Sequence, residues 1–160
     1  MNENVKELVD LMCKAAELTG TVNGLGDDLG IISRTELAMY MMYLSMSDGE
    51  ISTSEAETIS QVCGLELAPE ELAYFVADND ILNPEFGKNV PVTLKILVKT
   101  DNDMKGMGND DVKYSDYVLE TYKAIGELVI GADKQVKDEE TENFKNYIGM
   151  MEDYISNNLK

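Results

Sequence analysis

The chain contains no histidine, and this absence excludes several kinds of active site. Ser-His and Cys-His nucleophile pairs cannot form, and neither can the Glu-x-x-His motif of iron-binding helical bundles. Paired carboxylates remain available for hydrolysis, but neither glycine-containing loop carries a phosphate-binding lysine. We therefore expect a protein without catalytic activity.

Cysteine is almost absent as well. The two cysteines, Cys13 and Cys63, are far apart in the sequence, and each belongs to an apolar helical pattern. Such residues are typical of a reduced core and do not suggest a disulfide or a CxxC site. Without histidine or paired cysteines, soft metals such as zinc and copper are disfavoured.

Basic residues are scarce, with 13 Lys and Arg against 31 Asp and Glu, which gives a formal charge of -18. This charge repels nucleic acids and anionic membrane surfaces and attracts cations or basic protein surfaces. The apolar fraction of 44% is too high for a disordered acidic tail. We expect one folded domain that covers residues 1–160 and does not bind nucleic acid.

Long hydrophobic runs are also missing, so no segment approaches the roughly 20 apolar residues of a transmembrane helix. The first residues, "MNENVKELVDLMCK", lack the basic region and the continuous apolar run of a signal peptide. These features predict a cytoplasmic protein without a transmembrane segment.

Apolar residues recur with helical spacing along the chain, and no segment shows convincing strand alternation. The pattern predicts an all-α fold, a compact bundle of about seven helices. The expected helices cover residues 5–20, 37–46, 52–64, 69–76, 92–99, 114–129 and 144–155. We expect the second and the sixth of these helices to be the most buried.

The second helix, "LAMYMMYLSM", has apolar residues on every side, which is typical of a buried helix. Its methionines are expected to fill the core. Ser33 and Glu36 precede it as a capping-box pattern. The stretches "TGTVNGLGDDLG" and "TDNDMKGMGNDD" are rich in glycine or polar residues and are expected to be loops, the first of them mobile.

The stretch "MSDGEISTSEAE" suggests either a cation site or a well-capped start of a helix. Read as an EF-hand, it places Asp48, Gly49 and Glu55 at suitable loop positions. Positions 1 and 3 of that loop then fall on Leu44 and Met46, where calcium requires oxygen ligands. A standard EF-hand is therefore excluded.

A shift of the chain by 85 residues aligns "SDGEISTSEAETI" with "ADKQVKDEETENF". Asp48 then matches Asp133, and Glu55 matches Glu140. In both copies a long apolar helix leads into a short turn with an aspartate, and a second helix follows with carboxylates in its first turns. The pattern predicts a pseudo-repeated helical hairpin.

Helix capping alone offers another explanation for the first copy, because Ser52 can cap the helix and Glu55 can close the capping box. The second copy has Lys137 in place of Ser52 but keeps the aspartate and the glutamate. A hard cation would require both carboxylates, whereas a helix cap would not. The two interpretations remain open at this stage.

These two motifs, helix-"MSDGEISTSEAE"-helix and helix-"GADKQVKDEE"-helix, resemble the TerB-like domains associated with tellurite resistance and related bacterial stress systems. The resemblance covers nearly all 160 residues. It implies an all-helical domain with internal pseudo-symmetry and an acidic cluster that binds a divalent metal. Carried over by position, the implied ligands are Asp48, Glu50 and Glu55 in the first motif and Asp133, Glu139 and Glu140 in the second.

The second motif departs from the family pattern, because Lys134 and Gln135 replace its glycine and acidic residue. Asp133 and Glu140 are therefore its better candidate ligands.

The leading hypothesis is a non-catalytic cytoplasmic domain that binds a divalent cation, such as calcium, and acts through protein partners. By resemblance, these partners would belong to a tellurite or envelope stress response. The alternative is a metal-independent acidic interaction module, or a nucleic-acid mimic, that blocks a basic partner. The sequence gives no indication of the oligomeric state.

Overall fold

The structure is a computed structural model that describes residues 3–22, 28–45, 53–63, 70–71, 88–108, 113–132 and 138–159. These residues form six α-helices and no strand, which confirms the all-α fold. The helices are α1 (Glu3–Val22), α2 (Asp28–Ser45), α3 (Thr53–Cys63), α5 (Val92–Gly106), α6 (Tyr114–Ala132) and α7 (Asp138–Asn158).

The predicted helix at 69–76 lies mostly outside the described residues. Of this segment, only Glu70 and Glu71 are described, and both are helical and exposed. The count of seven helices therefore stays a prediction.

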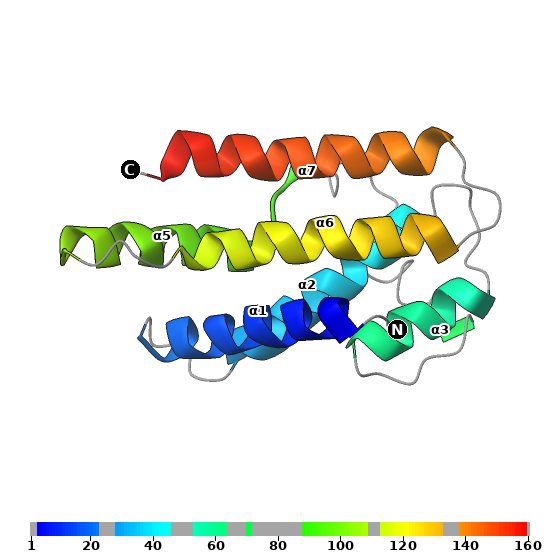
Figure 1. Cartoon of the computed structure of the whole chain (residues 1–160), viewed down its shortest axis with the longest axis horizontal. Helices are drawn as coiled ribbons and strands as arrows, with labels where there is room; N and C mark the ends of the chain where they lie inside the picture. The colour runs from blue at the N-terminus through cyan, green and yellow to red at the C-terminus, as the bar shows by residue number, and fades with distance from the viewer. Residues whose placement is uncertain are drawn as a thin grey trace.

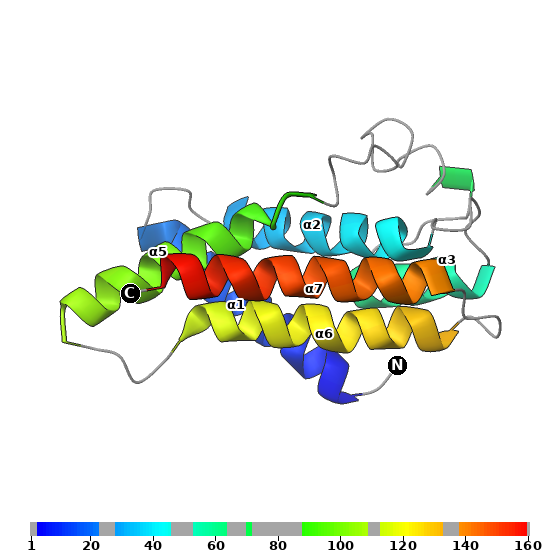
Figure 2. The same cartoon turned by 90° about the horizontal axis from the view of Figure 1, so that it is seen from above.

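Two helices, α2 and α6, occupy the centre of the bundle. Each of them packs against the other and against α1, α3, α5 and α7. Figures 1 and 2 show α6 and α7 side by side along the length of the molecule. The prediction that these two helices are the most buried agrees with this position, because α2 and α6 have the smallest shares of exposed residues among the described helices. None of the described helices combines the length and the apolar character that crossing a membrane requires.

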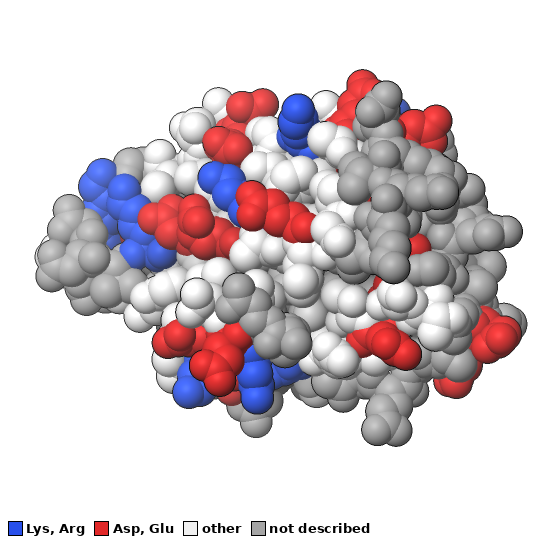
Figure 3. All heavy atoms as spheres, turned by 45° about the vertical axis from the view of Figure 1, so that its right-hand side comes forward, with Lys and Arg blue, Asp and Glu red and all other residues white. Residues whose placement is uncertain are grey.

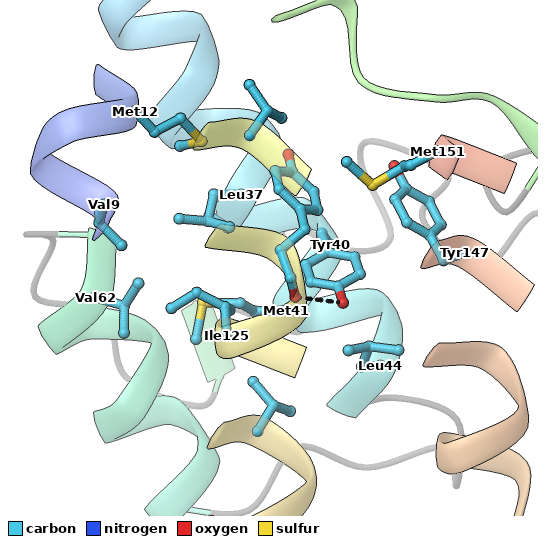
Figure 4. Packing of buried hydrophobic residues seen from close by; sticks show 14 of the residues in the cluster. Val9, Met12, Leu37, Tyr40, Met41, Leu44, Val62, Ile125, Tyr147 and Met151 are labelled. Carbon is cyan, nitrogen blue, oxygen red and sulfur yellow. Dashed lines mark hydrogen bonds between the residues drawn. The ribbon is translucent and has the colours of Figure 1, made fainter. Parts of the chain in front are cut away.

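The core forms around α2, which is buried on most of its circumference. Its side chains lie between those of α1, α6 and α7, as Figure 4 shows for Leu37, Tyr40 and Met41. Met41 and Met42 are buried, and Met39 packs against the core from its edge. The α2 methionines that the structure describes therefore fill the core, as predicted.

The apolar stripe predicted for α1 also faces the core, and Cys13 lies beside it as a buried free thiol. The hydroxyl of Ser33 on α2 donates a hydrogen bond to Cys13 Sγ over 3.7 Å. Burial raises the pKa of the Cys13 thiol, so the thiol is neutral at physiological pH. The side chain of Cys63 is not among those described.

Three tyrosines join the central helices. Tyr40 Oη on α2 donates a hydrogen bond to the carbonyl oxygen of Tyr122 on α6 over 3.0 Å. The ring centroid of Tyr40 lies 4.6 Å from that of Tyr122 and 5.0 Å from that of Tyr147 on α7. Gly126 allows this approach, since a Cβ there would overlap the Phe144 ring and lie 2.5 Å from Tyr40 Oη.

The capping box predicted for Ser33 and Glu36 is wrong. The helix begins earlier, at Asp28, and the Ser33 hydroxyl donates to the carbonyl oxygen of Gly30 within it. Glu36 instead caps another helix: its carboxylate accepts the N–H of Val92 over 2.6 Å and the N–H of Thr93 over 3.0 Å, at the start of α5. A carboxylate at this position stabilises the exposed N–H groups and the positive end of the helix dipole.

The loop predicted for "TDNDMKGMGNDD" is wrong over its first seven residues, which continue α5 to Gly106. Asp101 is buried and accepts the N–H groups of Tyr114 and Ser115, the first two residues of α6. The adjacent Asn102 donates to the carbonyl oxygen of Asn158 at the end of α7. The last turns of α5 thus hold the start of α6 and the end of α7.

Candidate functional site

The two helices that follow the central pair begin 85 residues apart, α3 at Thr53 and α7 at Asp138. This separation equals the shift that aligns the two sequence motifs. Each helix packs against the central helix that precedes it, α3 on α2 and α7 on α6. In both views, the starts of α3 and α7 lie at the same end of the bundle, next to the ends of α2 and α6 (Figures 1 and 2). We call this part of the molecule the α3/α7 end.

Glu55 is the third residue of α3, and only 3% of its surface is exposed. Its burial follows from its position in the helix, because Ile59 and Val62 continue the same buried face one and two turns later. Glu57 lies on the opposite side of the helix and is exposed. The fold therefore separates two glutamates that are two residues apart in the sequence.

Glu140 occupies the equivalent place, as the third residue of α7, and is 1% exposed. The buried face of α7 continues from it through Tyr147, Ile148 and Met151. Glu139 and Glu142 are exposed, so the side chain of Glu139 does not accompany that of Glu140 into the interior.

Burial of these two carboxylates has an energetic consequence. An ionised carboxylate that is removed from water costs on the order of several kcal/mol, whereas the start of a helix returns at most about 2 kcal/mol. The dipole of the helix alone is therefore too weak to balance the cost. Both glutamates have further interactions within the chain, and these or a nearby cation must supply the difference.

Three of the six predicted metal ligands, Asp48, Glu50 and Asp133, lie outside the described residues. The other three are Glu55 and Glu140, which are buried, and Glu139, which is exposed. The described part of the chain contains no group of three or more His, Cys, Asp or Glu side chains placed to hold a metal ion. A site with three or more carboxylate ligands at the α3/α7 end would therefore include at least one side chain outside the described residues.

One further polar group, which the motif analysis did not single out, lies at this end. Ser45 is the last residue of α2, and its side chain is buried. Its Oγ has no hydrogen-bond partner among the residues that the structure describes. A hydroxyl oxygen is a hard donor of the kind that calcium and magnesium accept. The only signal in the sequence is its position, directly before the first acidic motif.

Comparisons of the chain with models of known protein families, with curated proteins and with solved structures give no match.

Proposed function

We propose that the protein is a non-catalytic domain that binds a divalent cation at the α3/α7 end and acts through protein partners. The observation that carries this proposal is the equivalence of Glu55 and Glu140. Each is the third residue of its helix, each is buried, and the chain that contains them has a charge of -18. Two buried carboxylates at one end of an acidic molecule favour a bound positive charge between or beside them.

The proposed ligands are Asp48, Glu50, Glu55, Asp133 and Glu140, with Glu139 a weaker candidate because its side chain is exposed. All of them are carboxylates, so the cation is a hard one, and calcium is the first choice. Ser45 Oγ, backbone carbonyl oxygens and water would complete the six to eight oxygens that calcium takes.

The cellular role in this proposal comes from the resemblance to TerB-like domains. It assigns the protein to the cytoplasm and to a tellurite or envelope stress response, in which cation binding changes the affinity for a protein partner. The pseudo-repeat of two helical hairpins, α2 with α3 and α6 with α7, belongs to the same proposal. A shared site between the two hairpins would explain why both copies keep the aspartate and the glutamate.

The experiment that tests the cation is calorimetric titration of chelator-stripped protein with calcium, magnesium and manganese. Glu55→Gln and Glu140→Gln remove one charge each and keep the size of the side chain. The matched controls are Glu57→Gln and Glu142→Gln, which make the same change at exposed positions two residues further along the same helices. We expect the first pair to weaken binding at least about ten-fold and the controls to change it little.

A shared site predicts a stoichiometry near one and little further loss in the double variant Glu55→Gln/Glu140→Gln. Two sites that are lost independently would exclude sharing. No heat of binding for any of the three cations would exclude the cation proposal, and the two buried glutamates would then be parts of helix caps.

The second candidate function is a metal-independent acidic interaction module or nucleic-acid mimic, which the charge of -18 favours. It predicts partner binding that weakens strongly with salt and does not respond to chelator. If the domain depends on a cation, chelator should change its affinity for the partner. A single binding experiment with and without EDTA therefore separates the two candidate functions.

A further inference from the structure

The helix α5 differs in charge from the rest of the molecule. Among the six described helices, only α5 has more basic than acidic residues, with three lysines and two aspartates. One of these aspartates, Asp101, is buried and occupied by the first turn of α6. The outer surface of α5 therefore carries three lysines, Lys95, Lys99 and Lys105, against a single exposed aspartate, Asp103.

Lys99 Nζ lies 2.9 Å from Asp103 Oδ2 one turn along the helix, and Lys88, Lys99 and Lys105 have further interactions within the chain. Exposed pairs of this kind are weak and readily exchange partners. Lys88 lies just before the helix and is exposed as well. The segment 88–108 thus keeps a net positive charge in a strongly acidic chain.

Exposed apolar side chains lie at both ends of the same helix. Val92, its first residue, is 49% exposed, and Met107, directly after its last residue, is 76% exposed. Val92 and Lys95 are one turn apart, and Lys99 follows one turn later, so these three side chains share a face. An exposed apolar side chain beside two lysines lets this face form one apolar contact and ion pairs with acidic groups. We call Val92, Lys95 and Lys99 the α5 face.

A complementary surface is present on the chain itself. The helix α7 carries the exposed acidic residues Glu139, Glu142, Glu152 and Asp153 and only one lysine, Lys145. In Figure 3, a group of basic atoms lies at the edge where Figure 1 places the end of α5, and acidic atoms with further basic atoms are spread over the rest of this view. We propose that the α5 face binds the acidic outer face of α7 on a second copy of this chain.

Two different faces meet in such a contact, so it is head-to-tail and leaves one face free on each outer molecule. It would build open oligomers of increasing length and not a closed dimer. The contact would be weak, because it consists of a few exposed ion pairs and one or two apolar side chains. We expect association at protein concentrations of about 0.1 to 1 mM.

The net charge of -18 opposes self-association at long range, which gives the proposal a distinctive salt dependence. At about 0.01 M salt the Debye length of about 30 Å lets whole molecules repel each other. At about 0.15 M it falls to about 8 Å, so local ion pairs outweigh the distant repulsion. At about 1 M these pairs are screened too. Association should therefore be strongest at the intermediate concentration.

Sedimentation equilibrium of the full chain in EDTA tests this at the three salt concentrations, and EDTA removes bridging cations. We expect the weight-average mass to rise above 17.8 kDa without a plateau, most strongly at intermediate salt. Association that only increases with salt would overturn the proposal in favour of purely apolar contacts. A mass of 17.8 kDa under all conditions would overturn the proposal, because the lysines of the α5 face would then contact solvent and no second molecule.

Two charge-reversed variants locate the contact. Lys95→Glu/Lys99→Glu should weaken association at least about ten-fold, while Lys6→Glu/Lys14→Glu makes the same change in net charge on α1 and should weaken it far less. Equal loss in both variants would show that only net charge matters and would exclude the α5 face.

A mixing experiment tests the head-to-tail geometry. Glu152→Gln/Asp153→Asn neutralises the acidic face, and the variant should be monomeric alone, as should Lys95→Gln/Lys99→Gln. Mixed one to one, the two variants retain one intact face each and should form a dimer that does not grow further. Absence of that dimer, despite association of the unmodified chain, would exclude α7 as the second face.

Discussion

Asp101 and Ser115 form two hydrogen bonds through a single carboxylate oxygen. Oδ2 of Asp101 accepts the Ser115 N–H over 3.0 Å and its hydroxyl over 2.6 Å. Glu36 and Thr93 repeat this arrangement at the start of α5, where Oε1 accepts the N–H over 3.0 Å and the hydroxyl over 2.6 Å. Two neighbouring helices are thus capped by carboxylates from outside their own chain segment, in the same way.

The Asp101 contact should contribute strongly to stability. Asp101→Ala leaves the first N–H groups of α6 and the Ser115 hydroxyl without their acceptor in a buried place. A hydrogen bond to a charged group contributes about 1.5–3 kcal/mol, and the three bonds share one carboxylate and do not add fully, so we expect a loss of at least about 3 kcal/mol in the free energy of unfolding. Denaturant unfolding measures it. The control Asp103→Ala removes an exposed carboxylate two residues away and should cost less than about 1 kcal/mol. Equal losses would contradict the assigned role.

Gly126 should resist substitution by alanine. A Cβ there meets the Phe144 ring and the hydroxyl of Tyr40, which is held by its bond to the Tyr122 carbonyl. We expect Gly126→Ala to destabilise the protein by about 1–3 kcal/mol, the usual cost of overpacking a core. Gly149→Ala is the matched control, because no atom lies within 4 Å of the added Cβ in the middle of α7. It should be neutral or stabilise by up to about 1 kcal/mol. Thermal unfolding would distinguish the two, and a reversed order would contradict the packing described.

Alkaline pH should unfold the protein through its buried tyrosines. Burial raises the pKa of Tyr40 and of Tyr147 well above the ordinary value of 10.0, and burial also raises the pKa of Tyr43. The folded state keeps these protons where the unfolded state loses them. The stabilising contribution is therefore complete below pH 10.0, the ordinary value, and is lost progressively as pH rises above it.

The measurement is phenolate absorbance during a titration with base, followed in parallel with helical circular dichroism. We expect some tyrosines to ionise while the helices persist and the remainder to ionise only as the helices are lost. Ionisation of all 8 tyrosines in one step near the ordinary pKa, with the helices intact, would contradict the burial of Tyr40 and Tyr147.

Calcium should raise the melting temperature if the proposed site exists. Binding to the folded state alone stabilises by about 2.7 kcal/mol at a hundredfold excess over the dissociation constant. Screening of the charge of -18 also stabilises, so sodium chloride of equal ionic strength is the control. A shift that does not exceed the sodium control would contradict cation binding.

The sequence predicted the helical class and the burial of α2 and α6. These predictions succeed because apolar periodicity and turn signals act over a few residues. The cap at α5 could not be predicted, since Glu36 and Thr93 are 57 residues apart and the nearby Ser33 offers a local pattern that competes for Glu36. Only the packing of α2 beside the start of α5 decides whether Glu36 forms the local capping box or caps α5.

The prediction of a loop after residue 99 was wrong for a related reason. Polar composition predicts exposure, yet Asp101 is buried because the first turn of α6 supplies three hydrogen-bond donors for its carboxylate. At the candidate site, the sequence proposed Glu55, Glu139 and Glu140 as ligands and preferred Glu140 from the alignment of the motifs, but it could not show that Glu140 is buried and Glu139 exposed. That difference depends on the rotation of α7 against α6, which adjacent acidic residues do not reveal.

The bond between Tyr40 and the Tyr122 carbonyl joins residues 82 apart, and Thr121 Oγ1 contacts the carbonyl oxygen of Leu8 at a separation of 113. During translation, the methionine-rich α2 therefore leaves the ribosome long before α6 exists to cover it. Until α6 is made, the apolar α2 has α1 beside it but lacks its partner on the other side, and such surfaces recruit chaperones or aggregate. A chain truncated before α6 would keep that surface permanently, so the cell would treat a prematurely terminated product as a misfolded protein.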